Sequence, residues 1–239
     1  MKAYEFGAFD LAVAESRDEV PAEKNIHSVE FKNVSFAFNG TAVLQNFSSR
    51  IERGDFVGIT GPSGCGKTTL FNLLLGFLMS CEGEILINGL VMSNTTIRSF
   101  WPRIGYVRQQ SFFIHDTIAK NISFSENGYE KERLQLASAI SGLDAFFESS
   151  AAGPEKIITE NAKNISGGQQ QRISLARAVY KNADLILLDE PFNELDAESE
   201  LKLLQHFKAI ASSGKIVVMI SHNQKSLGHC NKIISLNGW

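Results

Sequence analysis

The chain of 239 residues has room for one large domain, or for one domain with a subdomain. Its 44% hydrophobic and 21% charged residues are ordinary for a globular protein, and a formal net charge of −3 gives no electrostatic basis for binding nucleic acid or an anionic membrane. Three cysteines without metal-ligand spacing indicate reduced thiols in a cytosolic protein, and no apolar run reaches the roughly 18 residues that a membrane helix needs.

The first ordered segments are predicted from alternating apolar residues. Residues 1–25 are acidic without a clear period, which is typical of a disordered tail or of a linker from another domain. Ser28–Phe38 alternates apolar and polar side chains and is predicted as a half-buried strand. Asn39-Gly40 is a hairpin-turn signal, so we expect residues 43–52 to pair back onto it. With a short strand at 83–89, the opening third is expected to be largely antiparallel β, with one further strand and helix set into it.

A glycine-rich turn joins that further strand and helix. The apolar residues 56–59 are predicted as a buried strand, and the apolar-periodic residues 70–78 as part of a helix that begins near Lys67. The turn, Gly61-x-x-x-x-Gly66-Lys67-Thr68, fits the phosphate-binding P-loop pattern. The alternative is a glycine-rich turn that binds nothing, but the strand before it and the helix after it favour nucleotide binding.

The residue types in this loop suit a nucleoside triphosphate. Glycines permit positive φ values and close backbone approach, so that successive amides can face one anion, and the helix N-terminus adds its dipole. Lys67 supplies a positive charge for the β- and γ-phosphates, and the Thr68 hydroxyl is a hard ligand for Mg²⁺. The residues expected to bind the nucleotide are Gly61, Pro62, Ser63, Gly64, Cys65, Gly66, Lys67, Thr68 and Thr69.

The rest of the chain alternates predicted strands and helices. Residues 103–107 are predicted as a strand, 129–147 as a helical insert and 149–164 as a polar loop. A helix with a Ser cap is expected over 166–180, and another over 196–210 with Asp196 as its cap. The predicted buried strands of this part are 185–188, 215–220 and 232–236. Strands that alternate with helices imply a parallel sheet.

Two carboxylates follow one of the buried strands. Asp189 and Glu190 stand at its carboxyl end, where open α/β sheets place their ligands. We expect Asp189 to hold Mg²⁺ and Glu190 to polarise an attacking water. The alternative is a helix-capping carboxylate beside Pro191. His222 also follows a buried strand, where a γ-phosphate contact is possible, although a lone His is more often a surface residue.

These pieces together resemble the nucleotide-binding domain of ABC transporters. The most specific match is Ile165-Ser166-Gly167-Gly168-Gln169-Gln170-Gln171-Arg172, which is similar to the ABC signature. The resemblance implies that Ser166, Gly167, Gly168 and Gln169 meet the γ-phosphate held by another subunit's P-loop, so that ATP is sandwiched in a head-to-tail dimer. The resemblance also implies a fold and a set of site residues for this chain.

The resemblance implies an α/β fold with three parts. These are a P-loop NTPase core built on a mainly parallel sheet with flanking helices, an N-terminal antiparallel β subdomain, and a helical subdomain that carries the signature. We expect residues 26–239 to form the ATP-binding domain. Its antiparallel β and P-loop core would occupy about 26–110 and 181–239, and its helical subdomain about 111–180.

The resemblance also assigns the remaining site residues. Phe38 stands where the family stacks an aromatic ring on adenine, and Gln109 where a glutamine links Mg²⁺ to the transmembrane partner. Leu195-Asp196 resembles the loop that touches the opposite subunit, and His222 the switch histidine. Hydrolysis would then use Glu190 as general base, with Lys67, Gln109 and His222 around the reacting phosphate, and Thr68, Gln109 and Asp189 as the metal set.

Some residues depart from the family pattern. Phe38 replaces the usual Tyr, and Arg108 stands where the family often has Pro. Residues 191–194, Pro-Phe-Asn-Glu, replace the Ala-Thr-Ser-Ala that is common in exporters, so the coupling between the two ATP sites could differ. None of these changes removes a catalytic group.

The segment 111–122 resembles the one that follows this glutamine in exporter-type domains. We therefore expect the ATP-driven motor of an exporter on the cytoplasmic face of a membrane, with ATP and Mg²⁺ as cofactors. Its partners would be a second ABC ATPase domain and transmembrane domains, and no nucleic acid. A soluble ABC ATPase acting on ribosomes or DNA is the alternative, which the net charge of −3 disfavours. A P-loop kinase or GTPase is disfavoured by the signature and Glu190.

Overall fold

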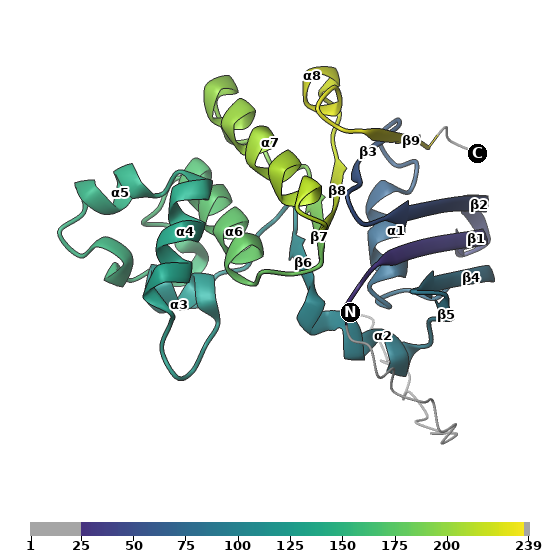
Figure 1. Ribbon diagram of the computed structural model, residues 1–239, viewed down its shortest axis with the longest axis horizontal. Coiled ribbons are helices and arrows are strands. Elements are labelled where there is room, and N and C mark those ends of the chain that lie inside the picture. Colours follow the sequence, from purple (N-terminus) through teal and green to yellow (C-terminus); the bar gives the residue numbers. More distant parts are fainter. Residues whose placement is uncertain (1–24, 237–239) are drawn as a thin grey trace, which may run out of the picture.

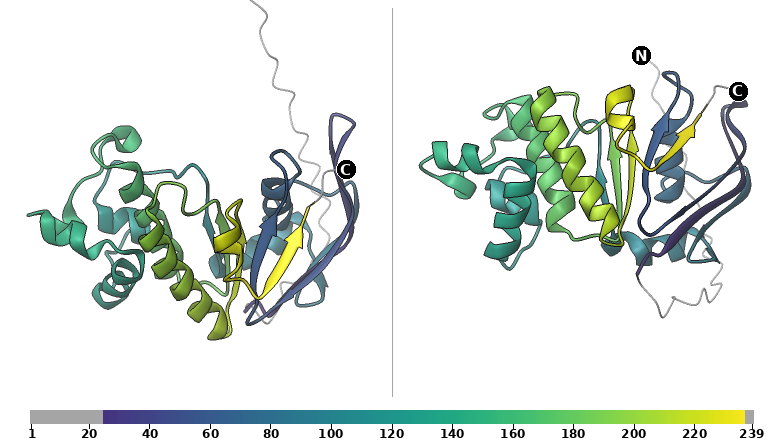
Figure 2. Two further views of the ribbon diagram at one scale, coloured as in Figure 1. Left: turned by 90° about the horizontal axis from the view of Figure 1, so that it is seen from above. Right: turned by 45° about the horizontal axis from the view of Figure 1, so that its top comes forward.

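The computed structural model describes residues 25–236. Residues 1–24, most of the predicted tail or linker, lie outside the described range. An antiparallel sheet, a parallel sheet and a group of helices succeed one another across the molecule (Figure 1). Both views of Figure 2 place the parallel sheet between the antiparallel sheet and the helices α3–α5.

The antiparallel sheet has the strand order β2-β1-β4-β5. Its strands are β1 (Ser28–Phe38), β2 (Thr41–Glu52), β4 (Glu82–Ile87) and β5 (Leu90–Val91). Asn39 and Gly40 both have positive φ, at 47° and 82°, and join β1 to β2 in a tight hairpin. The predicted hairpin and the strand after it are confirmed, and β5 is an addition to the prediction.

The parallel sheet has the strand order β6-β7-β8-β3-β9. Its strands are β3 (Phe56–Thr60), β6 (Ile104–Val107), β7 (Leu185–Asp189), β8 (Ile216–Ile220) and β9 (Lys232–Ser235), and all four pairings are parallel. The P-loop strand β3 therefore pairs with β8 and β9 from the far end of the chain. We had expected it to be set into the antiparallel part, but it does not pair with the strands there. The carboxyl ends of β3, β7 and β8 meet at one edge.

Both faces of the parallel sheet are buried because alternate residues point to opposite sides. One face, with Val57, Leu187 and Val218, packs on the core shared with α1 (Lys67–Leu74) and the antiparallel sheet. The other face, with Ile186, Leu188 and Met219, packs under α6 (Gly167–Tyr180) and α7 (Ala197–Ser212). This arrangement explains the continuous apolar runs of the sequence.

The helices differ in places from the sequence predictions. Helix α1 ends at Leu74 instead of 78, because Gly76 adopts φ 71° and an added Cβ there would lie 2.6 Å from Ile97. Three short helices had not been predicted: α2 (Asn94–Phe100), α3 (Ile118–Ser123) and α8 (Gln224–Leu227). The short 3₁₀ turns are Trp101–Arg103, Gly153–Glu155 and Glu160–Ala162.

The predicted helical insert at 129–147 consists of two helices. Helix α4 (Lys131–Ser141) ends where Gly142 adopts φ 71°, and α5 (Asp144–Ser149) begins after it. These helices and α3 pack on α6 (Gly167–Tyr180) around a separate apolar core. Helix α6 also contributes Leu175 and Ala178 to the core under the parallel sheet, so it joins the two parts (Figure 1).

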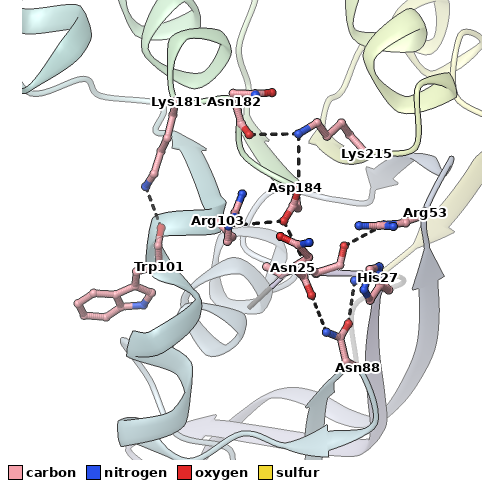
Figure 3. Close-up of polar contacts among 11 residues, drawn as sticks. Asn25, His27, Arg53, Asn88, Trp101, Arg103, Lys181, Asn182, Asp184 and Lys215 are labelled. Carbon is pink, nitrogen blue, oxygen red and sulfur yellow. Dashed lines mark hydrogen bonds and ion pairs between the residues drawn. The ribbon is translucent and has the colours of Figure 1, made fainter. Parts of the chain in front are cut away.

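A polar cluster holds the first described residues at the amino ends of the strands. Asp184, 7% exposed, accepts a hydrogen bond from Ile26 N at 3.2 Å and pairs with Lys215 Nζ at 3.4 Å (Figure 3). Asn88 donates to Asn25 O at 2.6 Å and accepts from His27 N at 2.7 Å. The chain thus enters the fold at the edge opposite to the P-loop.

Candidate nucleotide-binding site

The P-loop is a turn that only glycine can complete at several points. Gly61, Gly64 and Gly66 have φ values of 150°, 78° and 97°. An added Cβ at Gly61 would overlap the carbonyl oxygen of Leu236, and one at Gly66 would lie 2.9 Å from Val43 Cγ1. The glycines of the motif therefore meet a backbone requirement and a packing requirement together.

Lys67 is held over this loop. Its ammonium group donates to Gly61 O at 2.9 Å and to Pro62 O at 2.7 Å, and lies 3.9 Å from Cys65 Sγ. The side chain is only 6% exposed, although a lysine is seldom buried. The loop's own carbonyls thus fix a full positive charge beside the helix N-terminus, where phosphate oxygens bind in P-loop proteins.

Thr68 and Asp189 meet across the end of the parallel sheet. The Thr68 hydroxyl donates to Asp189 Oδ2 at 3.0 Å, and Asp189 is 3% exposed. Burial raises the pKa of the Asp189 carboxyl, and the nearby Glu190 charge raises it further, while the Thr68 hydrogen bond and the Lys67 charge lower it. Burial, followed by the charge of Asp189, also raises the pKa of Tyr106 to about 12.

The donor set fits Mg²⁺. A hydroxyl and a carboxylate are already in contact here, both are hard oxygen ligands, and Mg²⁺ keeps several waters instead of requiring a full protein cage. Among residues 25–236 no group of three or more His, Cys, Asp or Glu side chains is arranged to hold a metal.

Glu190 lies at the centre of the polar side chains. It adopts φ 48° directly after β7, and its amide donates to Ile220 O at 3.1 Å. Its Oε2 accepts from Gln109 Nε2 at 2.9 Å and from Asn193 Nδ2 at 2.8 Å. Its Oε1 lies 3.1 Å from His222 Nε2. Gln109 and His222 thus both contact the Glu190 carboxylate, on different oxygens.

The signature lies at the start of α6. Ser166 Oγ accepts from Gln169 N at 3.2 Å, and Gln169 Oε1 accepts from Ser166 N at 2.9 Å, which is a complete capping box. Added Cβ atoms at Gly167 and Gly168 would lie 2.9 Å from Glu194 Oε2 and 3.1 Å from Glu194 O. Within residues 25–236, no hydrogen bond or ion pair joins Ser166–Gln169 to the chain's own P-loop residues 61–69.

Phe38 lies at the end of β1. Its ring is 49% exposed and packs edge-on against Phe36, with centroids 4.7 Å apart. An exposed ring at a hairpin tip is compatible with stacking on a base, which stays a prediction. Two residues that the sequence did not single out do contact Glu190: Asn193, through its side chain, and Gln171, whose Nε2 donates to Glu190 O at 3.3 Å.

Comparisons with known proteins agree with this fold. The family model for ABC transporters matches residues 44–193. An ATP-dependent lipid A-core flippase of Syntrophus aciditrophicus (strain SB) is 33% identical over 234 residues, which are 97% of this chain and 39% of the flippase. A putative export ATP-binding/permease protein of Rickettsia typhi (strain ATCC VR-144 / Wilmington) is 38% identical over 216 residues, 88% of this chain and 37% of that protein.

A solved structure gives the same result. A bacterial Atm1-family ABC exporter with ATP bound matches with a TM-score of 0.82 and 31% sequence identity, over 88% of this chain and 37% of the exporter chain.

The chain belongs to the ABC transporter family. It is an exporter-type nucleotide-binding domain and an ATPase, and it spans about two fifths of the length of the curated relatives described above. The predicted family, fold class and enzymatic activity are thereby confirmed. No helix within residues 25–236 is long and apolar enough to cross a membrane.

Proposed function

We propose that this chain drives export across a membrane by binding ATP between two such domains and hydrolysing it there. The observation that carries the proposal is the contact of Glu190 with Gln109 and with His222 at the carboxyl ends of β6, β7 and β8, beside the Lys67 loop. In this proposal Glu190 is the general base, Lys67 binds the β- and γ-phosphates, and His222 contacts the γ-phosphate.

The metal would be Mg²⁺, held by Thr68, Asp189 and Gln109. The first two are in contact, and the Gln109 amide donates to Glu190 through nitrogen, which leaves its oxygen for a metal. Mg²⁺ supplies charge neutralisation of the transferred phosphoryl group when it is bound. Phe38 would stack on the adenine, and P-loop residues 61–69 would surround the phosphates.

The second half of each ATP site would come from another ABC ATPase domain. The capped start of α6 presents Ser166, Gly167, Gly168 and Gln169. The capping box uses the amides of Ser166 and Gln169, and those of Gly167 and Gly168, in the first turn, have no carbonyl partner within the helix. Since these residues make no polar contact with the chain's own P-loop, a head-to-tail pair of chains would bring each signature to the other subunit's ATP. Whether the two chains are identical is left to experiment.

A membrane part of the same transporter is the second partner that we propose, which places the chain on the cytoplasmic face. A groove of about 550 Å³ lies between β6 and the helical part, next to Gln109, and its lining includes Tyr106, Phe112 and Phe124. Phe112 is 63% and Phe124 49% exposed, so the groove offers apolar surface for a docking helix. Crosslinking from Phe112→Cys to the membrane part tests this; no crosslink at that position would refute the placement.

In the same proposal residues 26–239 form one ATP-binding domain, with residues 1–25 as the linker to the membrane part. The helical subdomain would be the unit at about 111–180, between the core segments at about 26–110 and 181–239.

The test of the mechanism is Glu190→Gln. Loss of a positioned general base costs about 10²–10⁴-fold in rate, so hydrolysis should nearly stop while ATP still binds. Unhydrolysed ATP should then hold two chains together. Sedimentation of this variant should show a dimer with Mg-ATP and a monomer with Mg-ADP.

Two further variants separate the halves of the site. Adding Ser166→Arg to Glu190→Gln should abolish the dimer without weakening ATP binding to the monomer, because it places bulk and charge at the start of α6. Lys67→Ala should lower ATP affinity by about ten- to a hundredfold, the effect of losing charge-assisted contacts worth roughly 1.5–3 kcal/mol. Full hydrolysis by Glu190→Gln, or unchanged affinity by calorimetry in Lys67→Ala, would refute the assigned roles.

A further inference from the structure

Asn193 contacts the carboxylate of Glu190, although it stands where the family usually has a serine. A carboxylate offers about four acceptor positions, two on each oxygen. On Glu190, Oε2 accepts from both Gln109 at 2.9 Å and Asn193 at 2.8 Å, and Oε1 lies 3.1 Å from His222. Both hydrogen bonds that residues 25–236 donate to this carboxylate therefore fall on Oε2, and Oε1, beside His222, is open to a water.

The turn that carries Asn193 is firmly held. Leu195 N donates to Phe192 O at 3.0 Å, and the Phe192 ring is 7% exposed in the core beneath α7. The Glu190 backbone is fixed as well, by Ile220 O and by the side chain of Gln171. Since both backbones are held, the Asn193 amide and the Glu190 carboxylate are kept within hydrogen-bond reach of each other.

We propose that Asn193 is a positioning residue for hydrolysis. Together with Gln109 it holds Oε2 of Glu190, so that Oε1 faces the attacking water beside His222. This inference rests on the proposed role of Glu190 as general base. An amide is suited to the task because it donates to the carboxylate without bringing a charge that would compete with the phosphates.

The position of Asn193 adds a link between the subunits. It lies two residues before Leu195-Asp196, the loop proposed to touch the partner, and in the same short turn. Contact of that loop with a second chain would therefore add to the contacts that hold this turn, and with it the donor to Glu190. The orientation of the base would depend on whether the partner is docked.

Three substitutions at Asn193 test the proposal by steady-state hydrolysis of Mg-ATP. Asn193→Ala should lower kcat about tenfold or more, the usual effect of removing a hydrogen bond to a charged acceptor, with KM for ATP unchanged. Asn193→Asp has nearly the same shape but places a second carboxylate against Glu190, so its kcat should be lower still. Asn193→Gln keeps an amide donor on a longer and more flexible side chain, so its kcat should lie between those of Asn193→Ala and the unaltered chain. Asn127→Ala, an exposed asparagine in the loop between α3 and α4, is the matched control and should behave as the unaltered chain.

A double-mutant comparison shows whether Asn193 acts through Glu190. Adding Asn193→Ala to Glu190→Gln should not reduce the residual rate further, because the group that Asn193 orients is already inactive. An additional tenfold fall would overturn the proposal, and so would an unchanged kcat in Asn193→Ala alone. A fall in kcat equal for Ala and Gln, with a matching loss of thermal stability, would likewise refute it and indicate a structural role. Full activity of Glu190→Gln would instead refute the proposed base, so the two failures are distinguishable.

Discussion

The substitution Gly61→Ala is expected to damage the P-loop at its first residue. Gly61 has φ 150°, a region that side chains rarely adopt. An added Cβ would overlap the backbone oxygen of Leu236 and lie 2.7 Å from Cys65 Sγ. The carbonyl belongs to the segment that follows β9 and cannot move alone, because Leu236 N donates to Thr60 O at 2.8 Å.

The two costs can be estimated separately. A residue other than glycine in such a backbone region costs on the order of 1–3 kcal/mol, and overpacking in a closed site costs about 1–3 kcal/mol. Gly61→Ala should therefore lower the free energy of unfolding by about 2–6 kcal/mol. For a chain of this size that is a fall in Tm of between about 4 and 24 °C. Because the loop must move to relieve the clash, ATP affinity should fall at least about tenfold at temperatures where the protein is folded.

Gly54→Ala is the matched control. Gly54 has φ 90° but nothing within 4 Å of an added Cβ, and it lies in the turn between β2 and β3. Only the backbone cost of about 1–2 kcal/mol applies to it, and ATP affinity should not change. Urea unfolding with linear extrapolation, and calorimetric titration with ATP, measure both quantities. Equal destabilisation by the two substitutions, or normal ATP binding by Gly61→Ala, would refute the packing argument.

Three further predictions concern cysteine reactivity, pH and the polar cluster of Figure 3. Cys81 is exposed and should be alkylated first at pH 8, whereas Cys230, whose pKa burial raises to about 12, should react slowly with or without nucleotide. Mg-ATP should slow the alkylation of only the buried Cys65. Equal protection of all three thiols would contradict the loop geometry. Tyr106 has a pKa raised from 10.0 to about 12, so its contribution to stability is complete below pH 10 and is lost as pH rises towards 12. Ultraviolet titration should show this phenol ionising last. A Tyr106→Phe chain should resist alkaline unfolding better between pH 10 and pH 12. Asp184→Asn should lower the free energy of unfolding by about 1–3 kcal/mol in thermal or urea unfolding, because it removes a buried carboxylate that pairs with Lys215. An unchanged stability would show that the cluster of Figure 3 does not hold the first described residues in place.

Much of the fold follows from local patterns in the sequence. The runs at 185–188 and 215–220 are apolar without interruption because both faces of the parallel sheet are covered, by α1 on one side and by α6 and α7 on the other. The β1–β2 hairpin follows from Asn39-Gly40, whose positive φ values suit the turn. The pairing of β3 with β8 and β9 could not be predicted from its neighbours, because it joins segments more than 150 residues apart.

The short helices were missed because their stabilisation is tertiary. Helices α2 and α3 have seven and six residues, too few to show a helical period. Their caps could have identified them: Ser93 accepts from Thr96 N, and Thr117 accepts from Lys120 N. The helical spacing at 129–147 predicted a helical insert but not its division at Gly142, whose positive φ ends α4.

The site residues likewise fall into two groups, those that local motifs predict and those that only the folded structure shows. Lys67, Thr68, Asp189 and Glu190 could be identified because each belongs to a local motif beside a strand end. The contacts of Asn193 and Gln171 with Glu190 could not, because they depend on the left-handed backbone of Glu190 and on the packing of α6 against the sheet. In the sequence, the departure of residues 191–194 from the family pattern pointed to this turn. It did not show that Asn193 contacts the Glu190 carboxylate.

Arg172 explains how the signature and the 191–196 turn can act as one unit. Its guanidinium donates from Nη1 to Ser141 O at 3.0 Å and from Nη2 to Ser199 Oγ at 2.6 Å, and it fills the space that a side chain at position 142 would need. Ser199 in turn donates to Asp196 Oδ2 at 2.6 Å, at the start of α7. The end of α4, the signature helix and the first turn of α7 are thereby joined through one cation. If a partner docks against Asp196, as proposed above, this path of contacts connects the docking surface to the signature helix through Ser199 and Arg172.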